Sequence, residues 1–214
     1  MKKKIIISTL IVVFILALDQ ILKIWIKTHF YLGENFNLIG DKIRLRFIEN
    51  PGMAFGLSWG EYWGKLFLSI FRIIAIGGLI YYLIYLIKKQ EKTLTIICLS
   101  LITAGAIGNL LDCMFYGLIF NESGIYPGQI AQLFPENGGY AGFLFGKVVD
   151  MFYCPLFIFP EWIPFLGGQE FFSPIFNVAD SAITIAVFIA LIFYKKIFKK
   201  NNTEIQETVK NAVE

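Results

Sequence analysis

Long apolar stretches dominate the pattern of hydrophobic and polar positions along the chain. Four of them, at about residues 5–26, 66–87, 93–120 and 175–194, approach or exceed the roughly 20 residues that a helix needs to cross a bilayer. Lipid offers the backbone no hydrogen-bond partners, so apolar spans of this length fold as helices. The sequence therefore predicts an all-α polytopic membrane protein with four transmembrane helices in a single domain, residues 1–214.

A different pattern follows the first span. Between residues 41 and 48 the apolar Ile43, Leu45 and Phe47 alternate with basic residues, which is typical of a half-buried strand. The strand runs into Asn50-Pro51-Gly52, where proline and glycine suit the centre of a type II turn. We expect a small β element outside the membrane, with its apolar face on lipid or on an extended peptide.

Lysines cluster at one end of the predicted helices, which indicates the cytoplasmic side. They are Lys2, Lys3, Lys4, Lys88, Lys89, Lys92, Lys195, Lys196, Lys199 and Lys200. Both termini, including a polar tail at residues 201–214, are then cytoplasmic. The long aromatic connections at residues 28–64 and 121–173 fall on the outer side and supply surface loops with tryptophans typical of the interface.

Composition narrows the function classes. Hydrophobic residues make up 57% of the chain and charged residues 16%, and the net charge of +3 is accounted for by the inner lysines, so no nucleic-acid partner is indicated. A single histidine excludes a multi-histidine zinc site, and the three cysteines form no CxxC pair. We expect no metal and no cofactor.

Carboxylates in this apolar background mark a candidate functional site, because an acid in hydrocarbon is costly. Asp150 and Asp180 are the principal pair. Counted at 1.5 Å per residue from the inner helix ends, Asp180 lies ~22 Å and Asp19 ~21 Å up, in the outer part of the bilayer. Asn109 and Asp112 reach the outer boundary on the same count, so three helices deliver polar groups to one level.

Two carboxyl groups close together in a partly dry site cannot both ionise, so they share a proton. The ionised member can take a proton from water that attacks a peptide carbonyl, while the protonated member donates to the carbonyl oxygen. This chemistry needs no metal or nucleotide. Which aspartate starts as the base stays open.

Other features have structural interpretations. Asp19 and Lys23 are spaced i, i+4, so a local ion pair explains both. Arg72 lies near enough to an outer helix end to extend its charge to the interface. The small residues between 104 and 108 suit close packing against a neighbouring helix.

Two further function classes are compatible with intramembrane carboxylates or long outer loops. A small carboxylate-dependent membrane transporter predicts an internal repeat and polar groups through the full membrane depth, and neither is apparent in the sequence. A non-catalytic assembly protein would depend on the outer loops and not on the aspartates. Replacing either aspartate of the pair by asparagine separates these classes.

Five short motifs, in order along the chain, resemble those of bacterial lipoprotein signal peptidase (signal peptidase II). They are Asp19-Gln20-x-x-Lys23, Asn50-Pro51-Gly52-Met53-Ala54-Phe55-Gly56, Gly108-Asn109-Leu110-Leu111-Asp112, Val148-Val149-Asp150 and Phe176-Asn177-Val178-Ala179-Asp180. The resemblance implies an aspartic endopeptidase of the bacterial cytoplasmic (inner) membrane, active toward the outer face. Its substrates would be diacylglyceryl-modified prolipoproteins, presented with membrane lipid and cleaved before the lipidated cysteine.

The resemblance also assigns roles to residues. Asp150 and Asp180 take the positions of the catalytic pair. Residues that shape or support the substrate site would be Asn50, Gly52, Asn109, Asp112, Asn177 and Ala179, with Asp19 and Lys23 bracing it from the first helix.

The chain departs from the family pattern in two places. The family continues its third motif with arginine after the aspartate, whereas Cys113 stands here, and Lys147, Arg44 or Arg46 are candidate substitutes. In addition, 37 residues separate Asp112 from Asp150, where the family usually has fewer than a dozen, and the stretch from Tyr153 to Pro174 is also enlarged. We expect these loops to form a lid over the aspartate pair, and deletion of residues 122–142 tests this.

Overall fold

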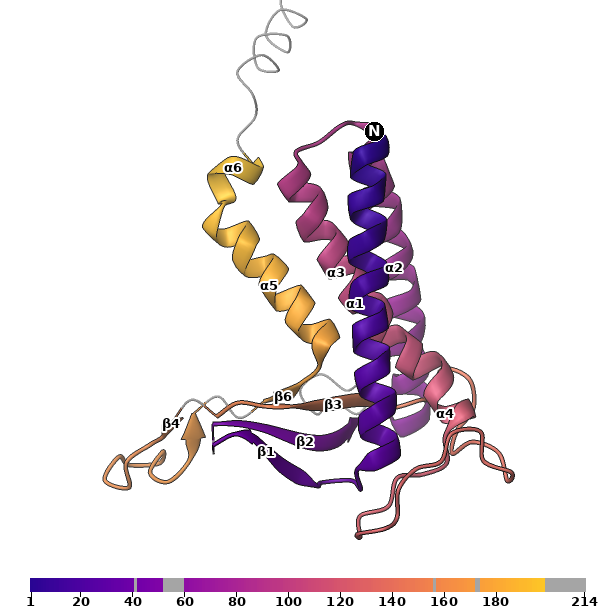
Figure 1. Ribbon diagram of the computed structural model, residues 1–214, viewed down its shortest axis with the longest axis vertical. Coiled ribbons are helices and arrows are strands. Elements are labelled where there is room, and N and C mark those ends of the chain that lie inside the picture. The colour runs from indigo at the N-terminus through magenta and orange to yellow at the C-terminus, as the bar shows by residue number, and fades with distance from the viewer. Residues whose placement is uncertain (41, 52–59, 156, 172–173, 199–214) are drawn as a thin grey trace, which may run out of the picture.

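The computed structural model describes residues 1–40, 42–51, 60–155, 157–171 and 174–198 (Figure 1). Its main helices are α1 (Lys2–His29), α2 (Lys65–Lys88), α3 (Thr93–Leu111) and α5 (Val178–Ile192). Short helical segments adjoin them: η1 (Gly60–Gly64), η2 (Asp112–Tyr116), α4 (Gly117–Ile119) and α6 (Tyr194–Phe198). With these extensions, three helices are long and apolar enough to cross a membrane, and α5 is shorter. The predicted polytopic helical fold is confirmed.

The fourth helix begins later than predicted, at Val178 instead of residue 175. Asn177 ends the preceding extended segment, because its side chain accepts a hydrogen bond from the Asp180 amide while the Asp180 side chain accepts one from the Asn177 amide. This reciprocal capping box satisfies amides that the first helical turn leaves unpaired. The capping residue Asn177 and the candidate catalytic residue Asp180 therefore hold each other in position.

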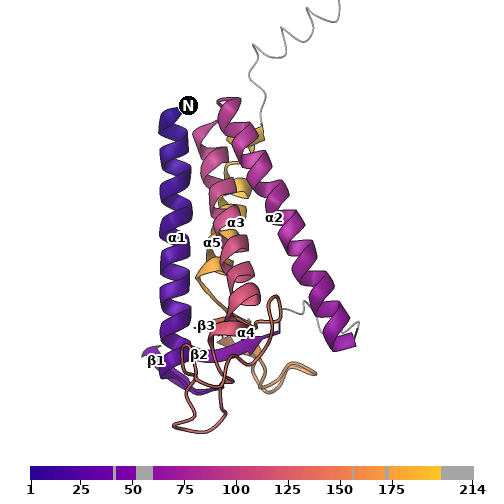
Figure 2. The ribbon, with the colours of Figure 1, turned by 90° about the vertical axis from the view of Figure 1, so that its right-hand side faces the viewer.

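Helix α3 lies between α1, α2 and α5, and small residues allow it to approach them closely (Figure 2). A Cβ atom on Gly105 would lie 2.3 Å from the carbonyl oxygen of Ala179, and one on Gly108 would lie 2.7 Å from Oδ2 of Asp19. The predicted packing surface at residues 104–108 is confirmed. Figure 2 also shows α2 leaning away from the other helices toward its N-terminal end.

An antiparallel sheet crosses the end of the bundle opposite the N-terminus (Figure 1). Its order is β1 (Asn35–Ile39), β2 (Ile43–Asn50), β3 (Val148–Tyr153) and β6 (Ile175–Phe176). Leu45 and Phe47 of β2 are buried in a core with Ile26 and Phe30 of α1. The predicted strand exists, but its apolar face is covered by protein, so the expectation of lipid or peptide on that face was wrong.

The insertion between Asp112 and Asp150 packs beside α4 and the end of α1. Ser123 accepts a hydrogen bond from Lys27 at 2.9 Å, and the carbonyl of Gly124 accepts one from the Leu32 amide at 2.8 Å. Within the described part of the chain, no hydrogen bond joins the insertion to Asp150 or Asp180. These contacts hold the insertion against the end of the first helix. They do not support a lid over Asp150 and Asp180.

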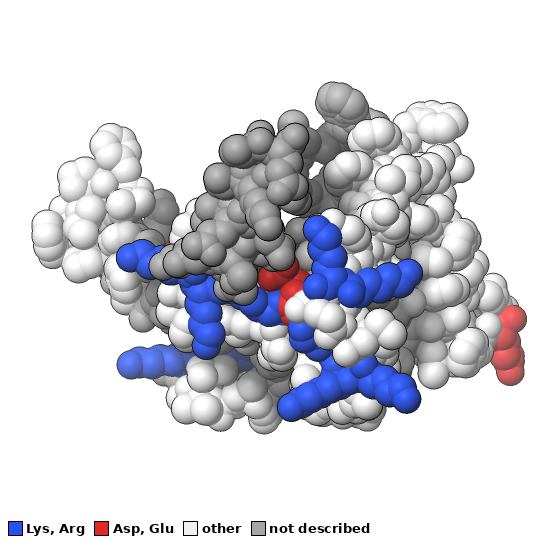
Figure 3. Space-filling view, turned by 90° about the horizontal axis from the view of Figure 1, so that it is seen from above, with Lys and Arg blue, Asp and Glu red and all other residues white. Residues whose placement is uncertain are grey.

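A second excursion, the hairpin of β4 (Phe157–Ile158) and β5 (Glu170–Phe171), projects sideways from the sheet (Figure 1). At the opposite end of the molecule lie the N-terminus and α6 (Figure 1), and basic side chains gather at this end when the bundle is viewed from above (Figure 3). The described lysines near the N-terminus, at the end of α2 and in α6 thus share one end of the fold.

Candidate active site

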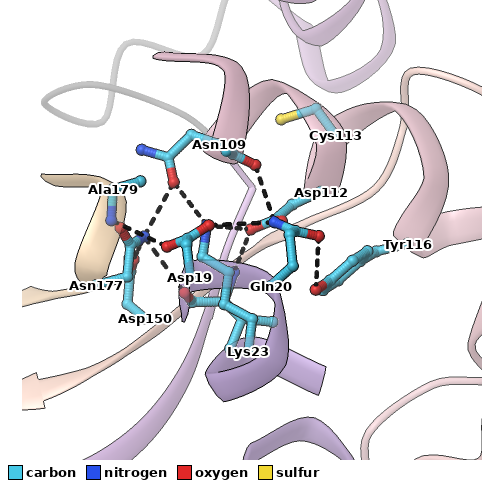
Figure 4. Close-up of polar contacts among 12 residues, drawn as sticks. Asp19, Gln20, Lys23, Asn109, Asp112, Cys113, Tyr116, Asp150, Asn177 and Ala179 are labelled. Atoms are coloured by element: carbon cyan, nitrogen blue, oxygen red, sulfur yellow. Dashed lines mark hydrogen bonds and ion pairs between the residues drawn. The ribbon is translucent and has the colours of Figure 1, made fainter. Parts of the chain in front are cut away.

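Strand β3 carries Asp150, and the first turn of helix α5 carries Asp180, where the sheet meets the bundle. Figure 4 shows Asp150 beside Asn177 and Ala179. The register of β3 with β6 pairs Phe152 with Phe176, which places Asp150 next to the chain entering α5. Asp150 is 5% exposed, whereas Asp180 is half-buried. One carboxyl group is therefore enclosed and the other is accessible.

Two asparagines link the carboxyl groups. Asn177 Nδ2 donates to Asp150 Oδ1 at 2.7 Å, and Asn109 Nδ2 donates to Asp180 Oδ1 at 2.8 Å. The asparagines also contact each other, since Asn177 Nδ2 lies 3.0 Å from Asn109 Oδ1. A more distant donor, Asn50 Nδ2, lies 3.4 Å from Asp150 Oδ2. The pair is thus held by neutral amides.

Burial, together with the nearby charge of Asp180, raises the pKa of Asp150 from 3.8 to about 7. Donors on Asn177 and Asn50 oppose this shift only in part. Asp150 therefore keeps a proton at near-neutral pH. One protonated and one ionised carboxyl group side by side can activate a water molecule and protonate a carbonyl oxygen.

Lys23 contacts three polar side chains that position the two aspartates. Its ammonium group lies 2.9 Å from Asp19 Oδ2, 2.7 Å from Asp112 Oδ2 and 2.9 Å from Asn109 Oδ1, and the Lys23 side chain is fully buried. All three N–H donors are used. The predicted i, i+4 pair with Asp19 exists, but Lys23 also reaches the site through Asn109.

The carboxylates paired with Lys23 fasten the segments that carry the catalytic candidates. Asp19 Oδ1 accepts a hydrogen bond from the Ala179 amide at 2.9 Å, and Asp112 Oδ2 accepts one from the Val149 amide at 3.3 Å. Ala179 precedes Asp180, and Val149 precedes Asp150. Buried charge thus positions the two aspartates through the backbone.

The structure brings nine of the ten residues of the predicted site together, and Gly52 lies outside the described residues. Two residues were missed: Gln20 donates to Asp112 Oδ1 at 2.9 Å, and the Tyr116 hydroxyl donates to Gln20 Oε1 at 3.2 Å. The position of Gln20, next to Asp19 on an apolar helix, was the signal available. Across the described residues, no group of three or more His, Cys, Asp or Glu side chains could hold a metal ion.

The candidate substitutes for an arginine at position 113 lie elsewhere. Lys147 pairs with Glu49 and Glu122, each at 3.3 Å, and Arg44 and Arg46 lie over the ring of Tyr153. These three side chains therefore serve the insertion and the sheet.

Arg72 reaches position 113 instead. Its Nη1 donates to the sulfur of Cys113 at 3.1 Å, and the side chain is half-buried. This contact with η2 adds to the expected reach of Arg72 toward the interface and was not predicted from the sequence.

A second polar cluster lies under the insertion. Lys27 forms an ion pair with Glu49, whose Oε1 also accepts a hydrogen bond from Ser123 at 2.7 Å. Burial is the largest influence and acts to raise the pKa of Glu49. The charge of Lys27, hydrogen bonds from Lys27 and Ser123, and the charge of Lys147 together outweigh burial and bring the pKa below its usual value. The ionised Glu49 therefore holds α1, β2 and the insertion together.

Comparisons with known proteins agree with this geometry. Residues 11–196 match the family model described as Signal peptidase (SPase) II. A lipoprotein signal peptidase from Porphyromonas gingivalis is 47% identical over 94% of this chain and 92% of its own length. One from Amoebophilus asiaticus is 33% identical over 80% of this chain and 70% of its own.

The fold has relatives among solved structures. Two structures described as a bacterial membrane enzyme, at 2.3 and 1.9 Å resolution, are 26% identical to this chain with a TM-score of 0.57. They match 91% of this chain and 92% and 94% of their own. The chain is a multi-pass membrane protease and belongs to the signal peptidase II family.

Proposed function

We propose that this protein is an aspartic endopeptidase that removes signal peptides from diacylglyceryl-modified prolipoproteins, hydrolysing the peptide bond before the lipidated cysteine. The observation that carries the proposal is the pair of Asp150 and Asp180, bridged by Asn177 and Asn109, in a member of the signal peptidase II family. Curated relatives named lipoprotein signal peptidase support the substrate class.

The environments of the two aspartates support different starting roles. Asp150 has the raised pKa, so it holds the shared proton and acts first as the acid. Asp180 is half-buried, whereas Asp150 is buried, so water reaches Asp180 more readily. The Asp180 oxygens accept N–H donors from Asn109 Nδ2 at 2.8 Å and from the Asn177 amide at 3.3 Å. Asp180 then acts first as the base.

In the proposed reaction, Asp180 takes a proton from water as the water oxygen bonds to the scissile carbonyl carbon. Asp150 gives its proton to the carbonyl oxygen, which forms a neutral tetrahedral intermediate. In the second step the C–N bond breaks and Asp180 passes its proton to the leaving nitrogen. Asp150 recovers its proton as the carbonyl re-forms, so the pair returns to its starting state.

Membrane placement fits this substrate. A diacylglyceryl anchor and an apolar signal helix both partition into lipid, so the bond between them lies near the interface. Asp180 lies in the first turn of α5, at the end of the bundle that carries the sheet. We place that end at the outer face of the bacterial inner membrane and the lysine-rich end in the cytoplasm.

The test compares purified protein acting on a lipidated prolipoprotein and on the same precursor without lipid. We expect cleavage of the lipidated form and a loss of roughly 10²–10⁴-fold in rate for Asp150→Asn and Asp180→Asn. Glu170→Gln, which makes the same acid-to-amide change on the projecting hairpin, serves as the matched control and should leave the rate unchanged.

Equal cleavage of both precursors, or of neither, would contradict the proposal. The transporter alternative makes the opposite prediction for the variants: ion or proton flux would depend on Asp150 and Asp180 in protein that processes no precursor. Flux into proteoliposomes, measured beside the cleavage assay, separates the two functions.

A further inference from the structure

We infer that Glu49 is a positioning residue, through which the insertion holds Asn50 against Asp150 from the opposite face of the sheet. The inference rests on the proposed peptidase function and deepens it. It gives the long segment between Asp112 and Asp150 a part in the reaction that is different from that of a lid.

Strand β2 presents Glu49 and Asn50 to opposite faces of the sheet. Its register with β3 places Glu49 directly opposite Val149. Because side chains alternate along a strand, Glu49 shares the face of Val149, and Asn50 shares the face of Asp150. Asn50 Nδ2 lies 3.4 Å from Asp150 Oδ2. This contact therefore depends on where the end of β2 is held.

The insertion holds that strand end at two points of the Glu49 carboxylate. The Ser123 hydroxyl donates to Glu49 Oε1 at 2.7 Å, and Lys147 Nζ lies 3.3 Å from Glu49 Oε2. Lys147 directly precedes β3. Lys27 of α1 completes the cluster, because it pairs with Glu49 and donates to Ser123 at 2.9 Å. Separate parts of the insertion thus contact one side chain of β2.

The cluster is dry, which makes its geometry consequential. The Glu49 side chain is 2% exposed and that of Lys27 is fully buried. The Lys27 ammonium also lies within 6.0 Å of three ring centroids, those of Phe47, Phe120 and Tyr140. Removing one partner of such a buried pair leaves an uncompensated charge, so the surrounding elements shift to solvate it.

Charged side chains face Glu49 and its partners from each element packed on them. They are Lys27 of α1, Lys65 of α2, and Lys147 and Glu122 of the insertion. The charges and donors that act on Asp150 are a different set: Asp180, Asn177, Lys23 and Asn50. Asn50 is the member of that set carried by β2, so Glu49 acts on Asp150 through Asn50.

The direction of the effect follows from the hydrogen bond. The Asn50 amide stabilises the ionised form of Asp150 and so acts to lower its pKa. When Asn50 moves away, the pKa of Asp150 rises further. A weaker acid donates its proton less readily, yet it keeps that proton to higher pH. Loss of Glu49 should therefore slow the reaction and also move the alkaline limb of its pH profile upward.

The test measures kcat for the lipidated precursor across pH. We expect Glu49→Gln to lower kcat roughly 3–30-fold, with KM within about twofold of the wild type. The alkaline limb should move up by roughly 0.5–1 pH unit, which corresponds to one hydrogen bond. Ser123→Ala should give a smaller shift of the same sign. Glu136→Gln, an acid-to-amide change at an exposed position of the insertion, is the control and should match the wild type.

A double-variant comparison separates this role from general loosening of the fold. Asn50→Ala should reproduce the shift of the alkaline limb, and adding Glu49→Gln to it should produce no further shift, because both changes act through the same contact. Thermal unfolding shows whether each variant is folded. If Glu49→Gln does not fold, Ser123→Ala combined with Asn50→Ala gives the same comparison.

A direct titration keeps the inference separate from the proposed function. The infrared band of the protonated Asp150 carboxyl group, identified by subtracting the spectrum of Asp150→Asn, reports its pKa without substrate. If the wild type cleaves no precursor, the proposed function fails and this titration still decides the role of Glu49. An unmoved Asp150 titration in both Glu49→Gln and Ser123→Ala, or a further shift when Glu49→Gln is added to Asn50→Ala, would overturn the inference.

Discussion

At the scale of single residues, the protonation of Asp150 connects catalysis to stability. Its pKa is raised from 3.8 to about 7, so the folded protein binds a proton that the unfolded chain releases between these values. Stability attributable to this residue is present at low pH and falls as pH rises toward 7. The carboxyl group that we propose as the first acid therefore costs the fold free energy at physiological pH.

Asparagine does not ionise, so Asp150→Asn removes the free-energy cost of ionising Asp150 in the folded protein. We expect the variant to unfold at a temperature roughly 3–8 °C above the wild type at pH 8, with the difference shrinking toward pH 4.5. Thermal unfolding in detergent across this pH range measures it, with Glu170→Gln as the control. A difference that stays constant with pH would show that the titration of Asp150 is not its cause.

Lys23 makes a second prediction at this scale, because it lies between two buried carboxylates. Lys23→Met leaves Asp19 and Asp112 without their shared cation and should destabilise the protein by about 3–5 kcal/mol, with loss of processing. Lys3→Met, the same change at an exposed terminal position, should alter stability by less than about 0.5 kcal/mol. Adding Asp112→Asn to Lys23→Met should restore part of the stability, and a further loss would be inconsistent with charge as the cause.

At the scale of elements, the β4–β5 hairpin exposes large apolar side chains. Phe165 is 98% exposed and Trp162 is 80% exposed, while Phe157 stacks on Phe171 to hold the hairpin together. Aromatic side chains of this kind favour the membrane interface. We expect the hairpin to lie among lipid headgroups beside the helices.

Quenching of Trp162 fluorescence tests this expectation. In a variant that keeps Trp162 and replaces Trp25, Trp59 and Trp63 by phenylalanine, brominated lipid in proteoliposomes should quench the emission. Bromine near the headgroup should quench more strongly than bromine near the chain terminus. Emission that is insensitive to both lipids would place the hairpin in water.

Acid should loosen the contact between the insertion and the rest of the fold, which depends on Glu49. Because the pKa of Glu49 lies below its usual 4.5, the stabilisation it supplies is present above pH 4.5 and is lost as pH falls through the lowered value. We expect hydrogen exchange at residues 121–134, corrected for the intrinsic effect of pH, to quicken below pH 4.5. Glu49→Gln should exchange faster at neutral pH and show little further change with acid.

At the scale of the whole molecule, the N-terminus and α6 lie at one end, where basic side chains gather, and the sheet lies at the other end. Our orientation predicts that Tyr126→Cys, at an exposed site of the insertion, reacts with an impermeant maleimide in spheroplasts. Lys89→Cys should react only after permeabilisation. Both variants need a background without Cys98, Cys113 and Cys154, and the reverse pattern would invert the orientation.

The sequence predicts much of this architecture because two signals in it are local. Apolar runs mark the helices, and the alternation at Leu45 and Phe47 marks β2. What covers that strand depends on α1, some 20 residues away, so periodicity could not show that protein and not lipid packs on it. Similarly, α5 is shorter than its apolar run because β6 takes residues 175 and 176 into the sheet.

For the candidate site too, some features could be predicted from the sequence and others could not. Polar residues that are costly in lipid, such as Asp112 and Asn177, stand out in the sequence whatever their partners. The partners themselves depend on the way helices pack, so the reach of Lys23 to Asn109 and of Arg72 to Cys113 could not be predicted from spacing along one helix.

The insertion begins and ends at nearly the same point of the fold. The Gly146 amide donates to the carbonyl of Cys113 at 2.9 Å, and the Val149 amide donates to Asp112 Oδ2. Hydrogen bonds therefore join the two ends of the insertion to each other. The turn near Tyr126 lies between these ends and contributes no residue to the candidate site. An epitope or a small reporter domain could be spliced into that turn, which gives this protease an external handle for purification, imaging and attachment to a surface.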